Sequence, residues 1–110
     1  MKLWIDDVRP APEGYIWVKS VNEEKNLISE NIVYAISHTL DECIIDTDHD
    51  AGEFVNNGGN YVKLFDWLEM VDLNDVQVLG DIFKYHIHSQ NPVGLENIRR
   101  IIRRNGWKEV

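Results

Sequence analysis

Short apolar runs alternate along the chain with stretches in which apolar residues recur at helical spacing. The runs at residues 2–5, 15–18 and 43–45 are rich in β-branched and aromatic side chains, which favours buried strands. Residues 82–88 alternate with a period of two and form the last predicted strand. Residues 32–36 are compatible with a strand and equally with the tail of a helix. Strands that alternate with helices predict an α/β fold with a mostly parallel central sheet.

Three segments have the spacing or the end signals of helices. Ser20, followed three residues later by Glu23, forms a capping box, so a helix is expected to begin there. Apolar residues from Tyr61 onwards recur at i, i+3, i+4 and i+7, which predicts a second helix. Asn91 and Pro92 are a typical N-cap and first residue of a third. The predicted inner faces comprise Val21, Leu27, Ile28, Leu64, Phe65, Leu68, Val71, Leu95, Ile98, Ile101 and Ile102.

The composition is that of a folded protein without membrane segments. The chain has 110 residues, of which 44% are hydrophobic and 27% charged, and this predicts one domain spanning residues 1–110. No apolar run approaches the roughly 20 residues of a transmembrane helix, so we expect no membrane partner. The single cysteine, Cys43, excludes an internal disulfide and a thiolate zinc site. We therefore expect the protein in the reducing cytoplasm.

The chain is acidic, with 19 acidic and 11 basic residues and a formal net charge of −8. Such a charge repels polyanions at long range, so long nucleic acid is not expected as a partner. The basic residues gather near the end of the sequence. That group comprises Arg99, Arg100, Arg103, Arg104 and Lys108. The last predicted helix is thus basic on an otherwise acidic chain.

Polar clusters follow three of the predicted strands at the point where each strand ends. Asp6 and Asp7 follow the first strand, residues 48–50 follow the central strand, and residues 88–91 follow the last. In a parallel α/β sheet the carboxyl ends of the strands meet at one edge, and ligands bind there. We therefore expect one site built from all three clusters.

The acidic residues at this edge are candidates for a divalent cation site. Asp6, Asp7, Asp48 and Asp50 offer carboxylate oxygens, the ligands that Mg²⁺ and Mn²⁺ prefer. The alternative is that these aspartates cap loops and helix starts. Which of Asp46, Asp48 and Asp50 faces the site depends on the register of the strand, which the sequence leaves open.

Three histidines are candidates for acid–base chemistry. Alternation places His86 and His88 on one face of the last strand, where they could share the roles of general base and general acid. The alternative is that both pack as inert strand residues. His49 lies between two aspartates, and a metal ligand, a third catalytic imidazole and a loop anchor are equally compatible with its position.

The residues around the start of the last helix are candidates for binding phosphate. Ser89 and Asn91 precede the helix, whose N–H groups and dipole favour an anion. Gly94, early in this helix, would let a ligand approach the backbone closely or would allow tight packing. Arg9, after the first acid pair, is a further candidate, with a surface ion pair as the alternative.

Three motifs together resemble the cyclic-phosphate processing receiver-like domain family. They are LWIDDVRP at residues 3–10, DTDHDAG at residues 46–52 and HIHSQNPVG at residues 86–94. The family is a derived form of the response-regulator receiver, so the resemblance implies a receiver-like three-layer sandwich. It also implies that Asp6, Asp7 and Asp48 correspond to the acids that hold Mg²⁺ in receivers.

Two departures from ordinary receivers favour chemistry on a bound phosphate over acceptance of a phosphoryl group. The lysine that precedes a proline in receivers is absent, and Asn91-Pro92 stands in a similar place. The strand that carries a single serine or threonine in receivers carries His86 and His88 here.

The combined expectation is a phosphoesterase, a hydrolase that opens cyclic phosphates of nucleotides or RNA ends, with Mg²⁺ or Mn²⁺ as its cofactor. His86, His88 and His49 are the expected catalytic residues, and the partner is a phosphate-containing small molecule or an RNA end. The alternative is a non-catalytic receiver-like module that binds a cyclic nucleotide or a phosphorylated partner. A third reading is an interaction domain whose acids are relics. The sequence does not specify the oligomeric state.

Overall fold

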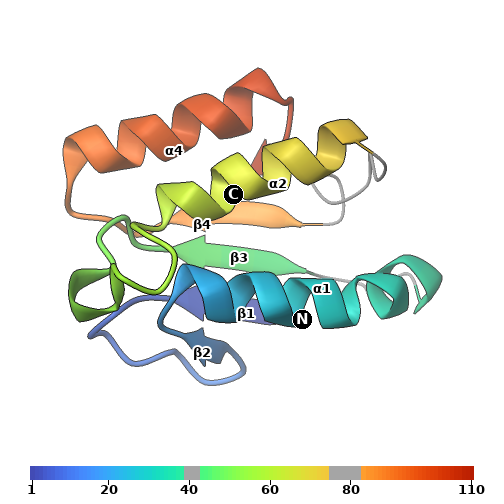
Figure 1. Ribbon diagram of the computed structural model, residues 1–110, viewed down its shortest axis with the longest axis horizontal. Helices are drawn as coiled ribbons and strands as arrows, with labels where there is room; N and C mark the ends of the chain where they lie inside the picture. The colour runs from blue at the N-terminus through green and yellow to red at the C-terminus, as the bar shows by residue number, and fades with distance from the viewer. Residues whose placement is uncertain (39–42, 75–82) are drawn as a thin grey trace.

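A five-stranded sheet, parallel throughout, forms the centre of the computed structural model, which describes residues 1–38, 43–74 and 83–110 (Figure 1). The strands, in the order β2-β1-β3-β4-β5, are β1 (Lys2–Ile5), β2 (Ile16–Val18), β3 (Ile44–Thr47), β4 (Lys84–Ile87) and β5 (Lys108–Glu109). The helices are α1 (Val21–His38), the short 3₁₀ helix η1 (Gly52–Phe54), α2 (Val62–Asn74) and α4 (Pro92–Arg104). The predicted α/β fold with a mostly parallel sheet is confirmed.

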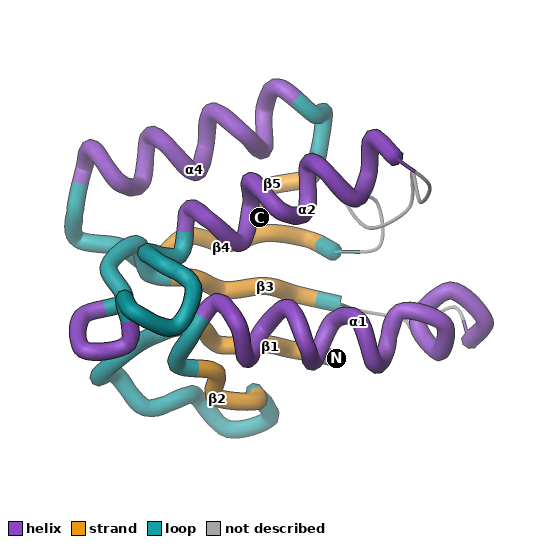
Figure 2. Tube along the Cα trace, in the orientation of Figure 1, coloured by secondary structure: helices purple, strands orange, loops and turns teal. Residues whose placement is uncertain are grey.

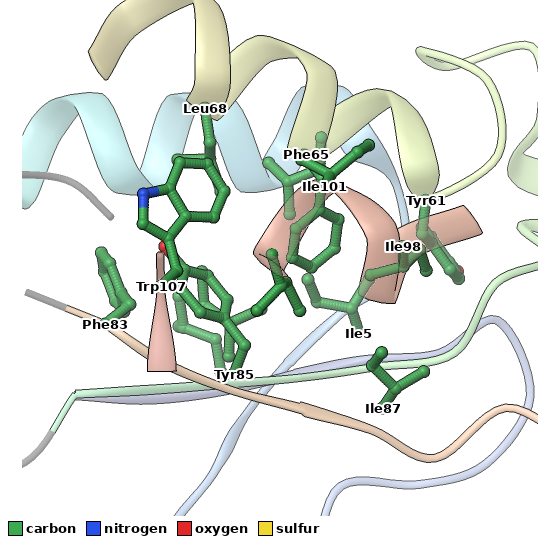
Figure 3. Packing of buried hydrophobic residues seen from close by; sticks show 14 of the residues in the cluster. Ile5, Tyr61, Phe65, Leu68, Phe83, Tyr85, Ile87, Ile98, Ile101 and Trp107 are labelled. Atoms are coloured by element: carbon green, nitrogen blue, oxygen red, sulfur yellow. The ribbon is translucent and has the colours of Figure 1, made fainter. Parts of the chain in front are cut away.

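Helices α1, α2 and α4 lie on one face of the sheet (Figures 1, 2 and 3). After β2 the chain always moves across the sheet in the same direction, to β3, then β4, then β5. Right-handed crossovers in one direction place their helices on one face. A helix between β1 and β2 would cover the other face, but Pro10, Pro12 and Gly14 keep this connection helix-free. In the described part of the chain the sandwich therefore has two layers, and the third layer that we expected is not seen.

The core lies between this helix layer and the sheet (Figure 3). Leu3, Ile5, Ile45 and Tyr85 point from the central strands towards the helices and are fully buried. The helices add Val21, Ile28, Leu64, Phe65, Leu68, Ile98, Ile101 and Ile102. Because side chains alternate along a strand, the residues between these, such as Asp46, point to the opposite face of the sheet.

The predicted helix starts are confirmed by hydrogen bonds. The Glu23 amide donates to Ser20 Oγ at 3.1 Å, and the Gly94 amide donates to Asn91 Oδ1 at 3.0 Å. Residues 32–36 belong to α1 rather than to a strand. None of the helices in the described ranges is long and apolar enough to cross a bilayer.

One strand prediction needs correction, and one strand was not predicted. The last predicted strand was expected over residues 82–88, whereas β4 is shorter; residue 82 lies outside the described residues and His88 follows the strand. The sequence did not predict β5, which has two residues and pairs Lys108 with Lys84. A pattern of alternation cannot be detected in so short a strand.

Candidate functional site

Three carboxylates converge where the carboxyl ends of β1 and β3 meet. Asp6 and Asp7 directly follow β1, and Asp48 follows β3. The chain leaves β1 towards one edge of the sheet and leaves β3 towards the other, so this is the topological switch point at which α/β folds bind ligands. One oxygen from each of the three lies within 4.8 Å of the others. Asp50, by contrast, is exposed and lies outside this group, which we call the acid cluster.

Asp6 is the most constrained member of the acid cluster. It is fully buried, and its Oδ1 accepts hydrogen bonds from the amides of Val8 at 2.9 Å and Arg9 at 2.8 Å. Burial alone would raise the pKa of Asp6, but the hydrogen bonds from these amides and from His88 outweigh it, and the pKa is lowered. Asp6 is therefore a fixed anion.

Asp7 is the member of the acid cluster whose negative charge is least favourable. Burial raises its pKa, and the charges of Asp6 and Asp48 raise it further. A Cβ on Gly52 would collide with Asp7 Oδ2, so the backbone of the β3–α2 loop closes directly over this carboxylate. Gly52 also has φ +54°, a conformation that glycine adopts at little cost. Repulsion among three clustered carboxylates is what a divalent cation relieves, and carboxylate oxygens suit Mg²⁺ or Mn²⁺.

His88 is held between two carboxylates on the open side of the sheet. Its Nδ1 lies 2.6 Å from Asp46 Oδ1, and its Nε2 lies 2.9 Å from Asp6 Oδ2. Its ring is stacked on the indole of Trp4. Burial alone would lower the pKa of His88, but the hydrogen bonds to Asp46 and Asp6 outweigh it, and the pKa is raised. His88 is thus an ion-pair partner of Asp6, with both ring nitrogens engaged.

His86 does not join this group. It shares a sheet face with His88, as the alternation predicts, but it is exposed. Its Nδ1 lies 2.7 Å from the main-chain oxygen of Val110, beyond β5. The structure therefore separates the two histidines that the sequence suggested as a pair.

His49 lies against the first turn of α4. Its Nδ1 is 2.8 Å from Asp50 Oδ1, and Asn91 Nδ2 donates to Asp50 Oδ2 at 3.4 Å. A Cβ on Gly94 would collide with the His49 ring, so this glycine serves tight packing of the imidazole. No hydrogen-bond partner of His49 Nε2 is found in the described part of the chain. The arrangement is that of a base oriented by a carboxylate.

Ser89 and Arg9 make contacts within the loops that surround the site. Ser89 Oγ accepts a hydrogen bond from the Asn91 amide at 3.1 Å. Arg9 Nη1 donates to the His88 carbonyl at 3.2 Å, and Arg9 Nε lies 4.0 Å from Asp6 Oδ2. Arg9 is therefore tied to the protein itself, although 41% of its side chain is exposed.

Three residues of the site were not identified from the sequence as part of it. Trp4 and Gly52 were not singled out, and Asp46 was left open. Asp46 and Trp4 lie in one cross-strand register and point to the face that carries His88. Once β1 and β3 are paired, alternation from Asp6 and Asp48 back to Trp4 and Asp46 would have indicated this.

One comparison with known proteins identifies a family for this chain. The model of the family described as the cyclic-phosphate processing receiver domain matches residues 1–104. No curated protein and no solved structure matches the chain. The matched range includes the acid cluster, His49, His88 and nearly all of the sheet. The chain therefore belongs to the cyclic-phosphate processing receiver domain family.

Proposed function

We propose that the protein is a phosphoesterase that opens cyclic phosphates of nucleotides or RNA ends. The observation that carries this proposal is the position of His49. It places an imidazole, oriented by Asp50, at the N-terminus of α4 and one residue from the acid cluster. A cation site, an anion site and a proton acceptor then meet at one edge of the sheet, which is what phosphate ester hydrolysis needs.

Asp6, Asp7 and Asp48 would hold the cation. Their oxygens lie within 4.8 Å of one another, close enough to share one ion. Burial raises the pKa of Asp7 and the charges of Asp6 and Asp48 raise it further, so a bound cation would stabilise this carboxylate. When bound, Mg²⁺ or Mn²⁺ would neutralise charge on the phosphate. The hydrogen bonds from the Val8 and Arg9 amides keep Asp6 in place for this role.

His49 is the better placed histidine for proton transfer. In the reaction a water oxygen forms a bond to phosphorus, one ring P–O bond breaks, and the released ribose oxygen takes a proton from solvent water. His49 Nε2 accepts the proton of the attacking water, while Asp50 fixes the ring through Nδ1. The first N–H groups of α4, with Asn91 and Ser89 beside them, would hold the non-bridging phosphate oxygens.

His88 acts on the acid cluster instead of on the substrate. Both of its nitrogens face carboxylates, so it orients Asp6 and offsets its charge. This arrangement also favours the second candidate function, a module that binds a cyclic phosphate without turnover, since it leaves His49 as the single proton-transfer group of the site among the described residues.

The two functions are separated by ³¹P NMR of 2′,3′- and 3′,5′-cyclic nucleotides incubated with the protein and Mg²⁺, Mn²⁺ or a chelator. We expect a monoester signal that depends on the cation. His49→Gln and Asp48→Asn should abolish it, and His86→Gln is the matched control that should retain it. Line broadening without product would support the binding module. A signal that survives both His49→Gln and Asp48→Asn would refute the proposed site.

A further inference from the structure

The face of the sheet opposite the helices is not covered by any helix in the described ranges (Figures 1 and 3). We call it the open face. Strand register and alternation assign to it Lys2, Trp4, Trp17, Ile44, Asp46, Lys84, His86 and Lys108. Its charge is opposite to that of the protein as a whole, since its lysines outnumber its single aspartate while the chain carries −8.

A row of lysines crosses one end of the open face. Lys2, Ile44, Lys84 and Lys108 are register partners on four neighbouring strands. Lys84 and Lys108 are direct neighbours, which costs stability because like charges then face each other across strands about 5 Å apart. Neither has an ion-pair partner in the described part of the chain, although acidic residues outnumber basic ones, 19 to 11. An external anion would relieve this repulsion.

An aromatic row lies next to the lysines. Trp17 and Trp4 are register partners and half-buried, and exposed His86 lies two strands further along the same row. Flat rings on a sheet face can stack against bases of any sequence. Trp4 also stacks on His88, so this row is continuous with the acid cluster.

We propose that the open face binds a short single-stranded segment of RNA whose phosphate end reaches the acid cluster. This rests on the proposed function and names RNA ends as its substrate class. Phosphates would lie along the lysine row, bases on Trp17 and His86, and the terminal phosphate at the strand ends, where Trp4 already stacks on His88. Those strand ends are four residues from Lys2, or about 13 Å at the usual rise.

Single-stranded RNA fits the open face better than a protein partner does. The outward residues include few aliphatic side chains, with Ile44 the main one, whereas stable protein interfaces have an apolar core. The net charge of −8 disfavours long polyanions at a distance, but it does not prevent a local lysine row from holding a few phosphates. A second copy of this acidic chain would use the same lysines, and light scattering without RNA distinguishes such a dimer from RNA binding.

The test is a fluorescence anisotropy titration of a fluorescein-labelled short oligouridylate that ends in a 3′-phosphate and so cannot be turned over by ring opening. We expect the double variant Lys84→Gln, Lys108→Gln to bind at least about tenfold more weakly at low salt. The magnitude of the slope of log binding constant against log salt concentration should fall by about 0.7 for each lysine removed. The matched control is Arg100→Gln, Arg103→Gln, which removes the same charge from the exposed side of α4 and should bind like wild type.

Absence of binding, or equal weakening by the lysine and arginine variants, overturns the proposal. A dimer seen by light scattering without RNA, and lost in the lysine variant, assigns the open face to a second copy and overturns it as well. The proposed function and the RNA-binding surface can fail separately in these experiments. Asp48→Asn, which should abolish turnover, should keep RNA binding. The lysine variant should hydrolyse a small cyclic mononucleotide as fast as wild type does.

Discussion

The imidazole of His88 lies parallel to the indole of Trp4, with ring centroids 3.9 Å apart and an angle of 3° between the planes. Stacking fixes the plane of the ring, and within that plane the two ring nitrogens are hydrogen-bonded to Asp46 and Asp6. His88 is therefore restrained in every direction, which suits a residue that positions Asp6.

Asp46 should control the charge of His88. We predict that Asp46→Asn lowers the pKa of His88, because the neutral amide no longer stabilises the imidazolium. The loss of the charged hydrogen bond should cost about 1–3 kcal/mol of unfolding free energy. NMR titration of the His88 ring protons in chelator measures the shift. Asp50→Asn should leave His88 unchanged, and an unaltered His88 titration in Asp46→Asn contradicts the assignment.

The stability contributed by His88 should depend on pH. Its pKa in the folded protein is raised above 6.5, so its stabilisation is fully present below 6.5 and is lost as pH rises through the folded value. In metal-free protein, the excess stability of wild type over His88→Gln should therefore shrink from mildly acidic to alkaline pH. Urea unfolding at several pH values measures it. A difference that grows with pH would contradict the ion pairs.

Glu24 is a buried carboxyl without a hydrogen-bond partner in the described structure. It lies on the inner side of α1, and burial, with the charge of Glu23 adding, raises its pKa from 4.5 to about 8. Wild-type stability should therefore fall as pH rises from 4.5 to 8. Glu24→Met should be several kcal/mol more stable at pH 8, since no charge is then buried. Denaturant unfolding measures this, and Glu30→Met, at an exposed position of the same helix, is the control.

Gly94→Ala should displace His49. In an exposed helix position this change gains about 1 kcal/mol, but here the new Cβ collides with the imidazole. We expect a net loss of stability, a changed NMR environment of His49 and slower turnover. Asn97→Ala, at an exposed position of α4, should be neutral or stabilising. If Gly94→Ala behaves like Asn97→Ala, the close contact does not exist in solution.

A divalent cation should reverse the effect of removing Asp7. Without cation, Asp7→Asn should be more stable than wild type, because the pKa of Asp7 is raised by burial and by Asp6 and Asp48. Wild type should gain about 2.7 kcal/mol at a hundredfold excess of Mg²⁺ over its Kd, and Asp7→Asn much less. Thermal unfolding with Mg²⁺ or chelator measures this. Asp66→Asn, exposed on α2, should respond as wild type does.

Much of the fold could be predicted from the sequence because its signals are local. The capping box at Ser20, the N-cap at Asn91 and the apolar spacing from Tyr61 each act within a few residues, and the structure confirms all three helices. Which side of the sheet each helix covers cannot be predicted from such local signals. It follows from strand order, which no local pattern contains, so the expected third layer was wrong for the described residues.

The site could be predicted only in part for the same reason. Strand ends indicated the acid pair, Asp48, His49 and His88, since acids and histidines after apolar runs are visible in sequence. The partner of His88 was not visible. Alternation correctly put His86 and His88 on one face, but only the register of β4 against β3 brings Asp46 to His88.

Alternation in the central strands also links the site to folding. Ile45 belongs to the core, and its neighbour Asp46 holds His88. A shift of β3 by one residue against β4 would turn Asp46 into the helix-covered core and Ile45 into water. A mispaired sheet would therefore lose the Asp46–His88 contact and would also bury the Asp46 carboxylate in the core. We expect sheet registration and assembly of the site to occur as one cooperative event, so that any molecule that has folded already has the acid cluster and His88 in place.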